Sequence, residues 1–191
     1  MLIGFCGPSA VGKTTIMRAL AKAYGWKFVR VATTRPIRDG EVEKFQVSRD
    51  SYDSMNGNGS FWCSNTLFGN SYGTLKNDIE HSKSTEDIYM LDWPITKVTF
   101  LNTVAHRIFL IVPETEEQLA NQAVACGRGD RLDEIISDFR LHYSTAKLHA
   151  LISEQKTPMV LLKNCKSADG NDSVTDICQY ILTEISQQTT T

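Results

Sequence analysis

The stretch Gly7-Pro8-Ser9-Ala10-Val11-Gly12-Lys13-Thr14 lies near the start of this 191-residue chain and fits the pattern GxxxxGK[ST]. An apolar run over residues 2–6 precedes it and is typical of a buried strand. After Thr14, apolar residues return at helical spacing until Gly25. Strand, glycine-rich turn and helix are the context in which this pattern holds phosphate. The stretch therefore predicts an α/β fold of the P-loop NTPase type, with a parallel sheet flanked by helices.

The loop itself predicts a site for the triphosphate of ATP. In such a loop, successive backbone N–H groups turn inward around the phosphate oxygens. Lys13 would bring positive charge to the β- and γ-phosphates and take part in catalysis, and the Thr14 hydroxyl would be a ligand of Mg²⁺. The nucleotide-binding residues expected here are Gly7, Ser9, Ala10, Val11, Gly12, Lys13, Thr14 and Thr15.

Asp92 closes an apolar run over residues 88–92 that predicts a second buried strand. An aspartate at this place suits a carboxylate that orients magnesium through water, beside the substrates. A helix cap is the alternative interpretation, because aspartate also favours that position. With the phosphate loop present, the metal role is favoured.

Composition excludes several classes of function. The formal net charge is −2 and no basic stripe is present, so nucleic-acid binding has no support. The five cysteines show no CxxC pairing, which favours a reducing compartment. The N-terminus shows no signal peptide, and no apolar run approaches the ~20 residues of a membrane span. We expect a cytoplasmic protein that acts on small molecules, as a monomer or homodimer.

The order of elements predicts a single domain over residues 1–191. Residues 1–32 and 86–185 would form the P-loop core, with strands expected over 26–32, 107–112 and 159–162 and a last helix over 174–185. Residues 33–85 are rich in Ser, Asn, Gly and aromatics, with strand-like pieces at 44–47 and 60–63, which favours an inserted β-rich acceptor-binding subdomain. A helix opening at Pro113, a break at 126–129 and one long helix over 132–154 follow, so that a helical lid would span about 120–142. Residues 186–191 are expected to fray.

Three further motifs identify a family resemblance. Thr33-Thr34-Arg35-Pro36-Ile37-Arg38, Gly69-Asn70-Ser71-Tyr72-Gly73-Thr74 and Gly127-Arg128-Gly129 resemble, in order, segments of guanylate kinases. The resemblance covers about residues 1–165 and implies ATP-dependent phosphorylation of a nucleoside monophosphate. It implies that Arg35, Arg38 and Tyr72 bind the acceptor phosphate and that Arg128 and Arg140 act in catalysis, with Arg131 as an additional candidate. It also places Asn164 near the adenine of ATP, although a loop-capping role is a close alternative.

The residues themselves support the acceptor-phosphate assignment. Arg35 and Arg38 stand three residues apart around a proline, so a stiff turn can direct both guanidinium groups at one phosphate. The resemblance also carries departures: one lid arginine falls at Val124, and the loop after Val42 is shorter. That shortening removes a phosphate-gripping tyrosine, whose space Lys44 or Phe45 would take.

The other departures gather where the family reads guanine. The family's glutamate falls at Cys63, a second acidic contact at Pro94 and a serine at Val31, whereas the hydroxyl residue Thr74 is kept. Hydrogen-bonded base sites discriminate by ~10⁴–10⁵-fold because the wrong base leaves partners unpaired. Here Cys63, Val31 and Pro94 predict a more apolar wall. GMP or dGMP is thus the family's default acceptor, and dTMP or another deoxynucleotide the acceptor that the wall favours.

Two other hypotheses remain open. A sugar-phosphate kinase similar to ribose 1,5-bisphosphate phosphokinases would need no base pocket, but the acceptor motifs look more like those of nucleotide enzymes. A non-catalytic guanylate-kinase-like binding module would tend to lose the phosphate loop, whereas this chain keeps Lys13 and Thr14.

Overall fold

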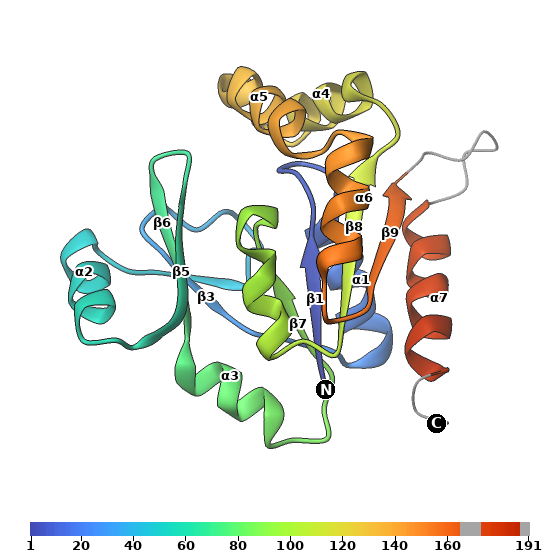
Figure 1. The fold of residues 1–191 in the computed structure, drawn as a ribbon. Helices are drawn as coiled ribbons and strands as arrows, with labels where there is room; N and C mark the ends of the chain where they lie inside the picture. The colour runs from blue at the N-terminus through green and yellow to red at the C-terminus, as the bar shows by residue number, and fades with distance from the viewer. Residues whose placement is uncertain (165–172, 188–191) are drawn as a thin grey trace.

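A five-stranded parallel sheet forms the centre of the computed structural model, which describes residues 1–164 and 173–187 (Figure 1). Its strand order is β2-β7-β1-β8-β9, and the chain enters it at β1 (Leu2–Cys6). The other strands are β2 (Lys27–Phe28), β7 (Tyr89–Asp92), β8 (Arg107–Pro113) and β9 (Met159–Asn164). Phe5 pairs with Asp92, so the loop after β1 and the carboxylate ending β7 lie at one edge of the sheet. The predicted P-loop-type α/β fold is confirmed.

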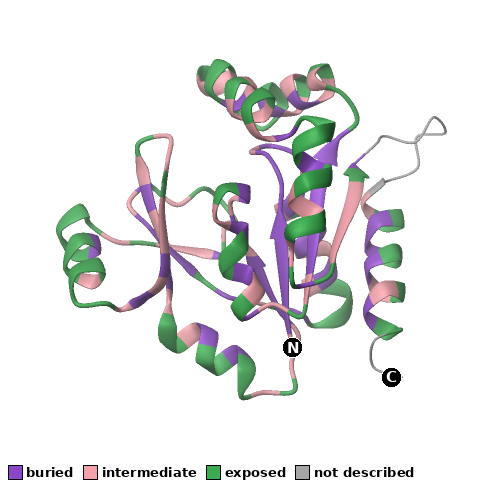
Figure 2. Ribbon diagram, in the orientation of Figure 1, coloured by how far each residue is buried: buried purple, intermediate pink, exposed green. Residues whose placement is uncertain are grey.

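Each face of this sheet has its own apolar core, because β1 is buried on both sides. Leu2 and Cys6 pack with the 3₁₀ segment η1 (Ile95–Thr103) and with α6 (Thr145–Glu154). Ile3 and Phe5 pack on the opposite face with α1 (Lys13–Tyr24) and α7 (Ser173–Ser186). The continuous burial of β1 and β8 in Figure 2 is typical of a parallel strand covered by helices on both faces.

A second sheet with strand order β4-β3-β6-β5 occupies the inserted segment. Its strands are β3 (Val31–Thr33), β4 (Lys44–Gln46), β5 (Phe61–Leu67) and β6 (Asn70–Leu75). Two helices that the sequence analysis did not predict accompany it, α2 (Arg49–Gly57) and α3 (Lys76–Lys83). The single strand expected over 26–32 is wrong: β2 pairs with β7 in the first sheet, and after Val29 and Arg30 the chain enters β3 of the second.

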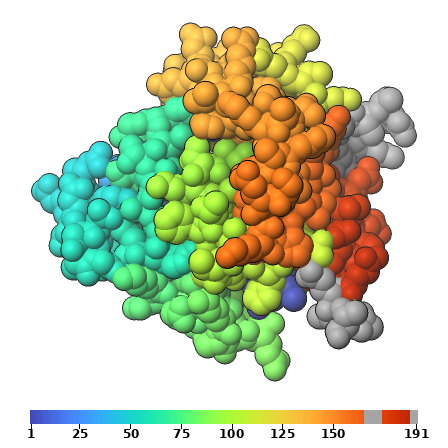
Figure 3. Space-filling model, in the orientation of Figure 1, coloured from blue at the N-terminus to red at the C-terminus, as the bar shows by residue number. Residues whose placement is uncertain are grey.

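The helices above the sheet edge are α4 (Glu116–Ala125), the short η2 (Gly129–Arg131) and α5 (Leu132–His142). Figure 3 shows them together at one end of the molecule, above the core and the second sheet. The single helix predicted over 132–154 is wrong, because the chain leaves helical geometry at Tyr143 and Ser144 before α6 begins. Both helices are amphipathic, so the periodicity alone could not reveal the break.

The ends of the remaining predicted helices also shift slightly. Pro113 is the last residue of β8, and α4 starts only after Thr115, whose hydroxyl accepts a hydrogen bond from the Gln118 N–H. Helix α7 runs to Ser186, and residues 188–191 of the predicted frayed tail lie outside the described residues. Within residues 1–164 and 173–187, no helix combines the length and the apolar character needed to cross a membrane.

Candidate active site

At two positions of the phosphate loop, the backbone has a positive φ that favours glycine. Gly7 has φ 148° and Gly12 has φ 94°, both on the left-handed side that favours glycine. A Cβ on Gly7 would lie 2.2 Å from the Ile111 carbonyl oxygen, and a Cβ on Gly12 would lie 2.7 Å from Asn164 Nδ2. Helix α1 begins immediately after this turn, at Lys13. The free N–H groups of its first turn and its dipole therefore face the loop, an arrangement suited to anions.

Lys13 lies buried across this loop. Its ammonium donates hydrogen bonds to the carbonyl oxygens of Gly7 at 2.8 Å and Pro8 at 2.9 Å, and lies 3.7 Å from Asp92 Oδ1. Burial lowers the pKa of Lys13, while the charge of Asp92 acts in the opposite direction. The lysine is thus positioned by the loop backbone, with Asp92 as its nearby countercharge.

Thr14 and Asp92 fit a magnesium ion shared with substrate phosphates. Both line the same cavity, and they offer a hydroxyl and a carboxylate, the hard oxygen ligands that Mg²⁺ prefers. Among the described residues there is no group of three or more His, Cys, Asp or Glu side chains that could hold a metal alone. This donor set suits an ion that takes most of its ligands from phosphate and water.

Asn164 contacts the phosphate loop from the end of β9. It ends β9, is 6% exposed, and its side-chain amide donates to the Val11 carbonyl oxygen at 2.7 Å. The backbone carbonyl oxygen of Asn164 accepts a hydrogen bond from Gln118 Nε2 at 2.6 Å. These contacts match the loop-capping alternative, and Asn164 does not line the cavity, so its role beside adenine stays a prediction.

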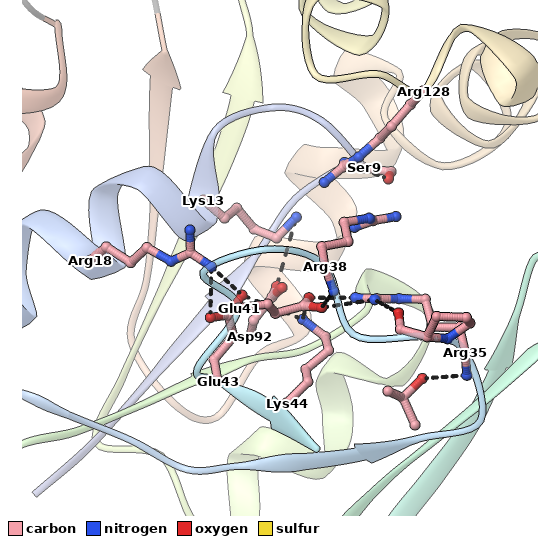
Figure 4. A network of polar contacts seen from close by, with 12 residues as sticks. Ser9, Lys13, Arg18, Arg35, Arg38, Glu41, Glu43, Lys44, Asp92 and Arg128 are labelled. Carbon is pink, nitrogen blue, oxygen red and sulfur yellow. Dashed lines mark hydrogen bonds and ion pairs between the residues drawn. The ribbon is translucent and has the colours of Figure 1, made fainter. Parts of the chain in front are cut away.

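The acceptor-phosphate candidates face the phosphate loop across one cavity of 320 Å³ (Figure 4). The Arg35 guanidinium donates to both carboxylate oxygens of Glu41, and the Arg38 backbone N–H donates to the same carboxylate at 3.1 Å. Burial alone would raise the pKa of Glu41, but these hydrogen bonds lower it to about 2. Burial also acts to lower the pKa of Arg35, yet its hydrogen bonds with Glu41 and Tyr72 raise it overall. Arg35 is therefore held charged beside Tyr72.

Sheet register explains which residues form the wall beside this site. Val31, Thr74 and Cys63 are directly paired across β3, β6 and β5, so their side chains lie in one row on one face. Val31 lines the cavity together with Pro94 and Trp93, whereas Thr74 and Cys63, further along the same row, are buried and do not line it. Burial raises the pKa of the Cys63 thiol, which keeps it neutral.

Asn65 is a cavity residue that the sequence analysis missed. It lies on the same face of β5 as Cys63, two residues on, and is paired with Tyr72 of β6. Its side chain lines the cavity and makes no hydrogen bond to the described residues. The predicted strand at 60–63 ended before Asn65; only the alternation of β5, continued to Leu67, would have identified it.

The three lid arginines do not lie together. Arg128 lines the cavity and donates to the Ser9 hydroxyl at 3.0 Å, joining the lid to the phosphate loop. Arg131 also lines the cavity and stacks 4.1 Å from the Phe68 ring centroid. Arg140 instead pairs with Glu116 on the exposed side of the lid and is 68% exposed there. Arg140 does not line the cavity, and its catalytic role stays a prediction.

Two lid residues outside the predicted set complete the cavity, Asp138 and Tyr143. Both line it, with Asp138 half-buried, and His142 Nε2 lies 3.8 Å from Asp138 Oδ1. Burial raises the pKa of Asp138, while His142 and Lys13 lower it. No sequence pattern indicated these residues, because their exposure to the cavity depends on the break between α5 and α6.

Comparison with known proteins places this arrangement in one family. The family model described as guanylate kinase matches residues 2–151. A guanylate kinase from a Nostoc species is 34% identical over 143 residues, covering 71% of this chain and 70% of that protein. One from Trichormus variabilis is 30% identical over 156 residues, covering 78% and 76%.

A solved structure agrees in fold. The crystal structure of guanylate kinase from Anaplasma phagocytophilum superimposes with a TM-score of 0.63 at 16% identity, over 98% of this chain and 85% of that one. The family model, the curated relatives and the fold thus agree with the phosphate loop and the arginines facing it. The chain belongs to the guanylate kinase family of phosphotransferases.

Proposed function

We propose that this chain transfers the γ-phosphoryl group of ATP to the phosphate of a nucleoside monophosphate. The observation that carries the proposal is a single cavity bordered by both halves of the reaction. Lys13 and the phosphate loop lie on one side, and Arg35, Arg38 and Tyr72 lie on the other. Relatives that are 30–40% identical are named guanylate kinases, which supports the same reaction type.

The chemistry asked of the protein is positional and electrostatic. The attacking group is a phosphate oxygen that is already anionic, so the reaction needs no general base. Lys13 and Arg128 would neutralise charge on the donor phosphates and on the transferring group, and their contacts with the phosphate loop support this role. Thr14 and Asp92 would hold Mg²⁺, which when bound neutralises charge on the donor phosphates. The lid excludes water that would otherwise accept the phosphoryl group.

The acceptor base is the part of the proposal that the family does not decide. GMP or dGMP is the default acceptor, because the relatives are named guanylate kinases. Val31, Pro94 and Trp93 line the cavity with the acceptor-phosphate candidates, whereas Cys63 is buried and does not line it. Such a wall offers the guanine donors fewer acceptors than a glutamate would and favours dTMP or another deoxynucleotide.

A coupled ADP-release assay across GMP, dGMP, AMP, dTMP, dUMP, dCMP and ribose 1,5-bisphosphate tests the proposal. We expect turnover of nucleoside monophosphates that depends on Mg²⁺ and falls at least 10²-fold in Lys13→Ala, since one preorganised charge at a transition state is worth about that much. Exclusive turnover of ribose bisphosphate would instead indicate a sugar-phosphate kinase. No turnover with any acceptor would indicate a binding module.

The base preference has a separate test in the same assay. Turnover of GMP and dGMP alone would contradict the apolar-wall interpretation. A Cys63→Glu variant should gain GMP turnover relative to dTMP turnover, because a carboxylate can accept from guanine N1 and N2. Cys63→Ser, which adds no carboxylate, is the matched control.

A further inference from the structure

Lys44 is the cavity residue whose chemistry remains unused. It is the first residue of β4, its side chain is 13% exposed, and it lines the cavity. Its ammonium lies 3.4 Å from Glu41 Oε1 and 4.0 Å from Glu43 Oε1, but makes no hydrogen bond within residues 1–164 and 173–187 (Figure 4). Lys44 is thus a cavity-lining ammonium that has two ion pairs but no close hydrogen-bond acceptor among the described residues.

The two nearby carboxylates already have closer partners. Glu41 accepts from the Arg35 guanidinium with both oxygens and from the Arg38 backbone N–H. Glu43, 5% exposed in its side chain, accepts from Arg18 of α1 at 3.1 and 3.3 Å. These carboxylates balance charge near Lys44, but they do not satisfy its donors. Because the ammonium lines the cavity, an anion bound there can accept the hydrogen bonds that these carboxylates do not.

The surroundings indicate which anion would fit. The Arg38 guanidinium also lines the cavity and has no hydrogen-bond acceptor among the described residues, whereas the Arg35 fork is engaged by Glu41. Burial lowers the pKa of Arg38, and the neighbouring charges of Arg35 and Arg128 lower it further. Cations that crowd in this way bind a doubly charged phosphate well, because it supplies both charge and several acceptor oxygens.

Strand register places Lys44 beside the acceptor. Lys44 is paired with Val31 in the parallel β3–β4 ladder, so the two side chains share one face, and both line the cavity. The neighbouring Phe45 points to the other face, where it packs with Tyr52 and Phe61 and stacks 5.0 Å from the Arg30 guanidinium. Of the two residues available in the shortened loop, only Lys44 reaches the cavity.

We propose that Lys44 binds the acceptor phosphate together with Arg38, as a specificity residue for a phosphorylated acceptor. This proposal rests on the proposed function for the identity of the acceptor. Lys44 supplies a full positive charge where the family uses a neutral tyrosine. Its carboxylate neighbours hold the ammonium at the cavity wall until a phosphate provides closer acceptors.

Binding isotherms of monophosphates and their parent nucleosides test the proposal. The variants are Lys44→Met, which keeps the apolar stem, Lys44→Arg, which keeps the charge, and Lys22→Met on the exposed face of α1 as the matched control. The probe pairs are GMP with guanosine and dTMP with thymidine. We expect Lys44→Met to raise the Kd of the monophosphate that wild type binds by roughly 10- to 100-fold, the range for a charge-assisted hydrogen bond.

The nucleoside supplies the decisive comparison. Its Kd should change less than about threefold in Lys44→Met, since it carries no phosphate, and Lys44→Arg should restore most of the affinity for the monophosphate. Equal losses for nucleoside and monophosphate would mean a merely structural role and overturn the proposal, as would an unchanged monophosphate Kd. Absence of phosphoryl transfer by the wild-type chain would count against the proposed function alone, because the isotherms need no turnover.

Discussion

Glu41 organises the acceptor side of the cavity at the scale of a single residue. One carboxylate receives the Arg35 guanidinium and the Arg38 backbone N–H, and Lys44 approaches it at 3.4 Å. The turn that carries both arginines is therefore closed on a buried anion. The same anion offsets part of the repulsion among Arg35, Arg38 and Lys44 before a phosphate binds.

This arrangement predicts how stability depends on pH. The pKa of Glu41 falls from 4.5 to about 2 on folding, so its contribution is fully present above pH 4.5 and is lost as the pH falls from 4.5 towards 2. We expect Glu41→Gln to have a lower free energy of unfolding than wild type at pH 7, with the difference shrinking below pH 4.5. Urea unfolding of both proteins between pH 3 and 7 measures it. A difference that is independent of pH would show that the carboxylate charge is not involved.

Asn65 allows a prediction about the acceptor. Its amide lines the cavity two residues beyond Cys63 on the same strand face, without a hydrogen bond to the described residues. We expect Asn65→Leu, which keeps the branched shape but removes the polar atoms, to raise the acceptor KM by about 3- to 10-fold, the worth of one hydrogen bond, and to leave the ATP KM unchanged. Thr66→Val on the opposite, exposed face is the control. An acceptor KM that does not move would remove Asn65 from the site.

At the scale of elements, the phosphate loop depends on the strand that ends beneath it. Asn164 of β9 donates to the Val11 carbonyl and also fills the space where a Gly12 side chain would lie. We expect Gly12→Ala to be folded but to lose ATP affinity by 10-fold or more, because the φ of 94° is strained for alanine and the new methyl meets Asn164 at 2.7 Å. Gly57→Ala, with open space around its Cβ, is the control. Thermal shift with and without ATP measures both, and equal ATP-induced shifts in the two variants would contradict this view.

The helices and strands also show how much of the fold could be predicted from the sequence. The β1–loop–α1 unit, the strand ending at Asp92 and the start of β9 at Met159 were predictable, because their patterns are local. The division of residues 26–33 between two sheets was not, since β2 and β3 differ only in their distant partners. The orientation of Arg140 was not predictable either: a motif match gives its position in the chain, but α5 turns the side chain to Glu116.

At the scale of the whole molecule, an ion pair and an aromatic pair are among the contacts that join the second sheet to the core. Arg18 of α1 pairs with Glu43, which lies just before β4. The ring centroids of Trp62 in β5 and Trp93, which follows β7, are 6.0 Å apart. The acceptor cavity lies between these two joined parts and is bordered by Arg18, Glu43 and Trp93. Contacts that hold the parts together thus also fix the distance between the phosphate loop and the acceptor site.

The Arg18–Glu43 pair therefore predicts coupling between the two sheets. Arg18→Met would leave Glu43 buried with only Lys44 at 4.0 Å, and we expect a loss of about 2 kcal/mol of unfolding free energy, within the range for a buried carboxylate deprived of its partner. Glu43→Gln alone and the double variant complete a mutant cycle, in which the double variant should lose about 1 kcal/mol less than the sum of the single losses. Urea unfolding gives the free energies and is followed by circular dichroism and by tryptophan fluorescence, which reports Trp26 in the core as well as Trp62 and Trp93. The wild-type protein should unfold in one transition that is the same by both probes. If the losses in the cycle were additive, the pair would not couple the two sheets.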